Sequence, residues 1–283
     1  MFDKTSTFVC VVVGATLASL PAAAQSGMEP EAVSSSPTDP EGVDSVTLPK
    51  GRVLLDAFLE INLVSGAEFK PFSISPDVWY GATDDITVGL VHSAVGTSGF
   101  IGGVGESLCL AGTGGGCGDV YHNVGVDVRY KLKTGMLAYA AEGGIFVGAF
   151  DPFQLDVKLG LVARWHQGKI AAELSPNLLI GLAGRTTTVN MVDVTTNGEV
   201  LNLPITGLYA ITPKISAALQ LGVVLPFESA ADTYRIPLSI GGHFQVNESI
   251  NVNLAFSLPA VAGGGSGTGF DSRTITLGGT YAF

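Results

Sequence analysis

The chain has 283 residues, and its 25 acidic and 14 basic side chains give a formal net charge of −11 at pH 7. A chain this acidic gives no reason to expect a nucleic acid as a partner. Hydrophobic residues make up 46% of the sequence, yet no apolar run reaches the length of a membrane-spanning helix. The apolar residues alternate with small or polar residues instead, and this alternation indicates β-strands.

The N-terminus has the three parts of a secretory signal peptide. Lys4 precedes an apolar run over residues 8–20, and small residues follow it up to Ala24. We therefore predict a signal peptide over residues 1–24, and we interpret Cys10 as part of this discarded segment. Residues 25–51 are acidic and rich in proline. Such a composition predicts a disordered segment, which we place in the periplasm.

From residue 52 onward, apolar and polar positions alternate with the period of two that a β-strand requires. The alternation is clearest over residues 153–165, where Val157 and Leu159 lie on one face and Asp156 and Lys158 on the other. The pattern predicts twelve strands, at about residues 53–64, 73–82, 86–95, 119–131, 135–147, 153–165, 169–181, 199–210, 214–225, 232–245, 249–260 and 272–283.

The connections between these strands alternate in length. Short turns such as Asp84-Asp85 and Gln167-Gly168 follow the even-numbered strands, and longer connections follow the odd-numbered strands. Short periplasmic turns and long extracellular loops are typical of outer-membrane barrels. We therefore predict an all-β fold, a closed antiparallel transmembrane β-barrel of about twelve strands over residues 52–283. The alternative is a soluble β-sandwich or lipocalin-like barrel, in which polar residues would face outward.

The last predicted strand ends on an aromatic residue. Ile275, Leu277, Tyr281 and Phe283 share one face of this strand. The ending resembles the C-terminal strand of bacterial outer-membrane β-barrel proteins of the porin or channel class, which finishes in a Phe preceded by alternating apolar residues. The resemblance implies that Tyr281 and Phe283 form a signal read by the barrel-assembly machinery, and that this strand pairs with the first one. It also implies contact with outer-membrane lipid and lipopolysaccharide.

Charged residues lie on the polar face of the predicted strands, which would face the lumen. Isolated buried charges are costly, so these residues should either pair with one another or line a polar pore. The predicted pore-lining residues are Asp56, Glu60, Asp77, Asp127, Arg129, Glu142, Asp156, Lys158, Arg164, Glu173, Lys214, Arg235 and His243.

A barrel of twelve strands lies between small filled barrels and wide porins. We therefore expect a narrow channel for the passive passage of small polar or cationic solutes, with the identity of the solute unknown. Two alternatives stay open, a filled structural barrel without transport and an outer-membrane lipid hydrolase. Because Ser93 directly follows His92, their side chains leave a strand on opposite faces, so this pair does not indicate an enzyme. We interpret His92 and His122 as polar residues near the outer rim.

Two cysteines, Cys109 and Cys117, remain after removal of the signal peptide, and both lie in the longest predicted loop. An even pair of cysteines in an exported protein favours a disulfide. No histidine or carboxylate lies between them, so we predict no metal site there, and no motif in the sequence indicates a cofactor.

We expect deletion of Phe283 to impair assembly, because the terminal aromatic residue carries the resemblance to known barrels. The yield of heat-modifiable, folded protein in outer membranes measures this effect. A yield equal to that of the full chain would contradict the prediction.

Overall fold

The computed structural model describes residues 45–63, 72–92, 108–115, 117, 120–121, 123–189, 192–195, 197–228, 233–264, 269 and 273–283. All of them belong to one compact unit, Val33–Phe283. The predicted signal peptide and residues 25–44 of the predicted disordered segment lie outside the described residues. None of the helices described is both long and apolar enough to cross a membrane.

The wall of the barrel is a closed antiparallel sheet of twelve strands. The uninterrupted strands are β1 (Val53–Asn62), β2 (Phe72–Gly81), β3 (Ile86–Val91), β5 (Val124–Lys133), β6 (Leu137–Phe150), β7 (Phe153–Gln167), β16 (Arg235–Gln245), β17 (Ile250–Gly263) and β18 (Thr274–Ala282). Three further wall strands consist of two segments each, β8 (Ile170–Leu174) with β9 (Asn177–Ala183), β12 (Val200–Asn202) with β13 (Ile205–Thr212), and β14 (Ile215–Leu221) with β15 (Val224–Pro226).

Two of the three interruptions coincide with prolines. The sequence pattern predicted continuous strands over residues 169–181 and 199–210, and each of these strands is divided at a proline. Pro176 lies between β8 and β9, and Pro204 lies between β12 and β13. A proline has no amide hydrogen to donate to the ladder. Both prolines still accept hydrogen bonds, from the amides of Leu161 and Ser175 respectively. The wall therefore stays continuous across these breaks.

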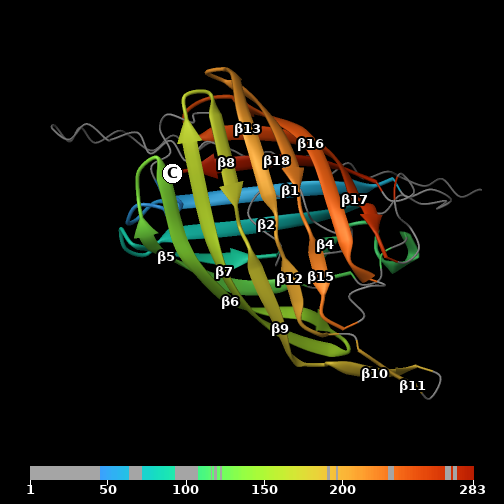
Figure 1. Cartoon of the computed structure of the whole chain (residues 1–283). Coiled ribbons are helices and arrows are strands. Elements are labelled where there is room, and N and C mark those ends of the chain that lie inside the picture. Colours follow the sequence, from blue (N-terminus) through green and yellow to red (C-terminus); the bar gives the residue numbers. More distant parts are fainter. Residues whose placement is uncertain are drawn as a thin grey trace, which may run out of the picture. The chain divides into compact units, whose positions relative to one another are not determined.

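The first and last strands close the barrel. Figure 1 shows β1 between β2 and β18, and the register runs from Leu54 opposite Ala282 to Asn62 opposite Thr274. The last residue takes part as well, because Phe283 and Val53 exchange two backbone hydrogen bonds of 3.0 and 2.8 Å. On the other side β14 pairs with both β13 and β16. The predicted pairing of the closing strand with the first strand is therefore present.

Both ends of the wall sequence, Arg52 and Phe283, lie at one end of the barrel, which we call the turn end. The connections at this end are 82–85, 134–136, 168–169, 213–214 and 246–249. The opposite end, the loop end, carries the long connections, with one exception. Asp151 and Pro152 join β6 to β7 there in a short turn.

Three short elements at the loop end lie outside the twelve wall strands. They are β4 (Leu108–Cys109), which pairs with β2, the 3-10 helix η1 (Thr113–Gly115), and the hairpin of β10 (Thr186–Val189) and β11 (Val192–Thr195).

The two faces of the wall have opposite character. On β7 the side chain of Leu159 is 55% exposed on the outer face, and that of its neighbour Lys158 is 2% exposed on the inner face. The same alternation holds on β5, where Val126 and Val128 are exposed and Asp127 is buried. A soluble barrel would place its polar residues outside, so the structure contradicts that alternative. The apolar outer face suits lipid instead.

We expect Leu159→Arg to lower the free energy of unfolding in lipid by about 2–4 kcal/mol, because the charge would face the middle of the bilayer. Leu137→Arg is the control, since Leu137 also faces outward but begins β6 at the turn end, where the cost falls to about 0–1 kcal/mol. Reversible unfolding in lipid vesicles measures both values. Equal costs at the two sites would contradict the assigned depth.

Candidate functional site in the barrel lumen

A network of four charged side chains lies on the inner wall of β5, β6 and β7. The ammonium of Lys158 is 2.6 Å from a carboxylate oxygen of Asp127 and 3.0 Å from one of Glu142, and Arg129 Nε donates to Glu142 at 3.1 Å. The register explains the contacts, since Asp127 and Lys158 both lie opposite Gly144, and Arg129 lies opposite Glu142. Each charge is therefore compensated within the wall, as burial requires.

Two aromatic rings fill the lumen beside this network. The guanidinium of Arg129 lies 4.2 Å from the centre of the Trp79 ring, and the ammonium of Lys158 lies 5.7 Å from that of Phe146. The rings lie over inward-facing glycines. A Cβ at Gly89 would be 2.5 Å from the Trp79 ring, and a Cβ at Gly125 would overlap Phe146. These glycines therefore make room for aromatic side chains, which narrow the lumen.

A second ion pair lies nearer the turn end. Arg164 of β7 donates to Glu173 of β8 through Nη2 at 2.6 Å and Nε at 3.1 Å, and the two residues are directly opposite in the register. This pair could be found from the sequence, because the two residues are nearly symmetric about the turn at Gln167-Gly168. Both nitrogens donate to the same carboxylate oxygen, Oε2, and these charge-assisted hydrogen bonds hold the two side chains together.

A cavity of about 140 Å³ lies inside the barrel beside these charges. Five predicted pore-lining residues reach it, namely Asp56, Arg129, Arg164, Glu173 and His243. Asn251, Asn253 and Thr280 line it from β17 and β18. Among the described residues, Arg129 Nη2 and Asn253 Oδ1 are buried and have no hydrogen-bond partner. Charged and amide side chains therefore form part of the cavity wall.

Residues 45–48 also line this cavity, which the sequence did not predict. Residues 25–51 were expected to be disordered in the periplasm, but within the described part of this segment Val46, Thr47 and Leu48 are buried. Val46 packs with Ala138, Ala140 and Val162 of the inner wall. The composition of the whole segment is acidic and rich in proline, and it gave no indication that Val46 and Leu48 near its end would be buried.

The remaining predicted pore-lining residues differ in their surroundings. Glu60 and Asp77 are buried on the inner face, and Asp156 is half-buried. Lys214 and Arg235 are exposed and do not join the buried charges. Lys214 belongs to the turn before β14, and Arg235 is the first residue of β16 at the loop end. Both residues are exposed at ends of the barrel wall, and their place along a passage stays a prediction.

His92 directly follows β3 at the loop end, and its side chain is buried there. Its backbone amide donates to Asp77 at 2.7 Å, and its Nε2 is 3.0 Å from the hydroxyl of Tyr121, whose ring stacks on Phe150. The bend toward Asp77 ends β3 at Val91, earlier than predicted. His122 lies outside the described residues, and the contact with Tyr121 had no signal in the sequence.

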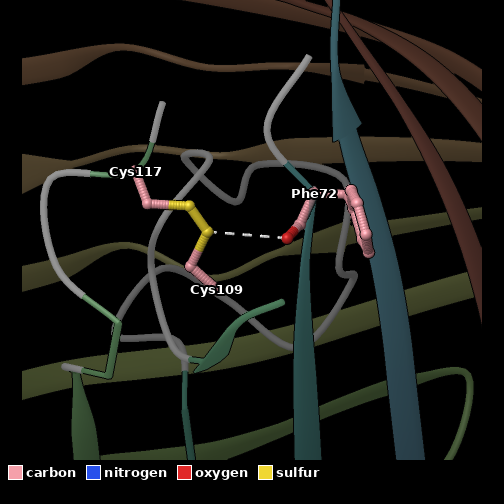
Figure 2. Close-up of a disulfide and its surroundings, with 3 residues drawn as sticks. All are labelled: Phe72, Cys109 and Cys117. Atoms are coloured by element: carbon pink, nitrogen blue, oxygen red, sulfur yellow. Dashed lines mark hydrogen bonds between the residues drawn. A yellow bond between two sulfur atoms is a disulfide. The ribbon is translucent and has the colours of Figure 1, made fainter. Parts of the chain in front are cut away.

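Cys109 and Cys117 are joined by a disulfide (Figure 2). Cys109 lies in β4 opposite Ser73, and its sulfur is 3.6 Å from the carbonyl oxygen of Phe72 at the start of β2. The bond therefore closes a small loop against the wall at the loop end. Among the described residues, no group of three or more histidine, cysteine or acidic side chains is arranged to hold a metal ion.

Solved structures with a similar fold are outer-membrane porins and channels. The chain matches the NanC porin with a TM-score of 0.56 at 9% identity, covering 80% of this chain and 98% of the porin. It matches an outer-membrane channel from Pseudomonas putida F1 with a TM-score of 0.54 at 14% identity, covering 87% and 99%. The match to the KdgM porin in complex with disordered oligogalacturonate has a TM-score of 0.50 at 8% identity, and it covers 81% of this chain and 99% of that porin. No protein-family model and no curated protein matches the chain. At these identities the likeness concerns the fold alone.

We expect Lys158→Met to lower the free energy of unfolding by about 3–5 kcal/mol, because Asp127 and Glu142 would lose their shared buried cation. The control is Lys131→Met, which breaks a pair with the exposed Asp85 and should cost about 0–1 kcal/mol. Adding Asp127→Asn to Lys158→Met should restore part of the loss. Reversible unfolding in lipid vesicles measures all three variants, and similar losses for the two single variants would contradict the role of the network.

Proposed function

We propose that this chain, which has the fold of outer-membrane porins and channels, is a narrow channel of the bacterial outer membrane. It would allow passive passage of small polar or cationic solutes. The observation that supports this function is the cavity inside the barrel, which has charged and amide side chains on opposite walls beside its apolar lining residues. A solute there could exchange hydrogen bonds with water for contacts with Arg129, Glu173 or Asn253.

The close charge contacts in the lumen join opposite charges. The pairs Arg164–Glu173 and Lys158–Asp127 each compensate an acid by a base. A strongly charged lumen would hold counter-ions tightly, whereas conduction needs binding that is weak enough for release. Paired charges provide polar contacts of that kind, so they favour small polar solutes over a single tightly bound ion.

A filled structural barrel is the second candidate, and a specific observation favours it. Most inward side chains are buried, including Trp79 and Phe146, and residues 45–48 occupy part of the lumen. The two candidates differ in conductance, because a filled barrel passes no ions under any condition.

The proposed orientation places the turn end in the periplasm and the loop end outside the cell. It rests on the general rule that periplasmic turns are short and extracellular loops are long. Acidic residues predominate in the loop-end connections, where Glu68, Glu106, Asp119, Asp151, Asp193, Glu199, Glu228, Asp232 and Asp271 accompany the basic residues Lys70, Arg185 and Arg273. Hydrogen bonds from Arg185 lower the pKa of the Glu199 carboxyl, so this acid stays ionised but is compensated. The surplus of acids makes the proposed outer mouth negative.

A negative mouth concentrates cations, so we expect a weak cation preference at low salt. The preference should fade as salt rises, because the screening length falls from about 10 Å at 0.1 M to about 3 Å at 1 M. Reversal potentials of the purified protein in a planar bilayer, under a potassium chloride gradient, measure it. Anion preference at low salt would contradict this prediction. Absence of conductance, both in the full chain and in variants of residues 45–48, would contradict the channel itself.

A further inference from the structure

Residues 45–48 fit two apolar sites on one side of the inner wall. Val46 enters the first, where Ala138 and Ala140 of β6 leave space for its side chain. Leu48 enters the second, which is formed by Trp79, Val91 and Phe146. The partly buried Leu54 and Leu179 pack against this second site. Inward positions of a membrane barrel are typically polar, so two apolar sites on the inner wall are matched to the two apolar residues of this segment.

The backbone around the segment is also accommodated by the wall. The amide of Leu48 donates to the hydroxyl of Thr87 at 2.8 Å, in a buried hydrogen bond. At the rim, Gly51 donates to the carbonyl of Gly81 at 2.8 Å. A Cβ at Gly81 would collide with the carbonyl oxygen of Pro49, so only glycine lets the chain pass so closely over the end of β2.

The other side of the segment faces the polar cavity. Ser45, Val46, Thr47 and Leu48 line it together with the polar residues of the opposite wall, such as Glu173, His243 and Asn253. The segment therefore borders the cavity, and its departure would enlarge the open space.

Residues 45–48 can leave without disturbing the sheet. None of them belongs to a strand, and none takes part in the barrel ladders. Among the described residues, the contacts that hold them include the burial of two apolar side chains and the bond from Leu48 to Thr87. Local openings of this kind, which leave the sheet intact, are less costly than global unfolding.

We propose that residues 45–48 are a plug, held in a docking site on the inner wall at the turn end, and that the passage widens when the plug leaves. The proposal rests on the proposed channel function for its consequence, but the seating of the plug can be measured without conduction. The plug restricts the lumen when seated, and the polar cavity is the part of the passage that stays open beside it.

The seating is tested by the reactivity of introduced thiols in the full chain, folded in lipid vesicles. Thr47→Cys places a thiol at a buried position of the plug, and Lys50→Cys places one at an exposed position just outside it. A water-soluble maleimide should label the thiol at position 47 at least about tenfold more slowly than the thiol at position 50, since labelling at position 47 requires the plug to open. Equal labelling rates would overturn the proposal.

The effect on the passage is tested by single-channel conductance in planar bilayers. Leu48→Ser weakens the seated state and should raise the open fraction by about tenfold or more. Leu55→Ser is the matched control. It makes the same leucine-to-serine change on the outer face of β1, away from the plug. Heat-modifiable mobility shows whether each variant is folded. If Leu48→Ser does not assemble, Val46→Ala takes its place as the test variant. It removes less buried surface and should also raise the open fraction.

The two measurements separate the possible failures. A protected thiol at position 47, with more conductance for folded Leu48→Ser than for Leu55→Ser, supports the plug. A protected thiol with equal, non-zero conductance for both variants overturns the restriction of the passage and leaves the channel function standing. A protected thiol with no conductance in any variant overturns the channel function and, with it, the consequence proposed for the plug.

Discussion

Closure of the sheet is the constraint on which the rest of this structure depends. Lipid offers no hydrogen bonds, so each backbone amide and carbonyl in the wall needs a partner within the protein. The pairing of β1 with β18 supplies the partners that an open sheet would lack, and the bonds between Val53 and Phe283 extend it to the last residue. Closure also divides the side chains of each strand into an outer set and an inner set.

The inner set has two different sides. The inner faces of β2, β3, β5, β6 and β7 carry aromatic rings, alanines and the network around Lys158. The inner faces of β16, β17 and β18 carry small polar side chains, among them His243, Asn251 and Asn253. An apolar segment therefore packs on one side and a polar cavity remains on the other. This asymmetry allows a single lumen to hold both the proposed plug and the proposed passage.

Burial explains why the lumen charges occur as pairs. An uncompensated charge in a narrow, protein-lined space is costly, and each close pair here joins side chains from neighbouring strands. The strand register thus determines which of these charged side chains meet. Barrels that share a fold can therefore differ in the width of their passage, because inward side chains such as Trp79 and Phe146 set it.

The sequence by itself determined the strands and their two faces, because alternation is local to each strand. Leu159 and Lys158 could be assigned to opposite faces from their spacing alone, and the same holds for the closing strand up to Phe283. The sequence could also indicate Cys109 and Cys117 as a pair, since they are the two cysteines left after the predicted cleavage.

Only the tertiary structure decided what fills the lumen. The contact of Lys158 with both Asp127 and Glu142 depends on the register of three strands, which alternation does not specify. Lys214 and Arg235 were assigned inward because strand ends are poorly defined by periodicity, and the structure places both at exposed ends. The burial of Val46 and Leu48 depends on wall residues far along the chain, such as Ala140 and Phe146. Two apolar residues within an acidic segment carry little signal of their own, and it is the shape of the closed inner wall that gives them a place to bind.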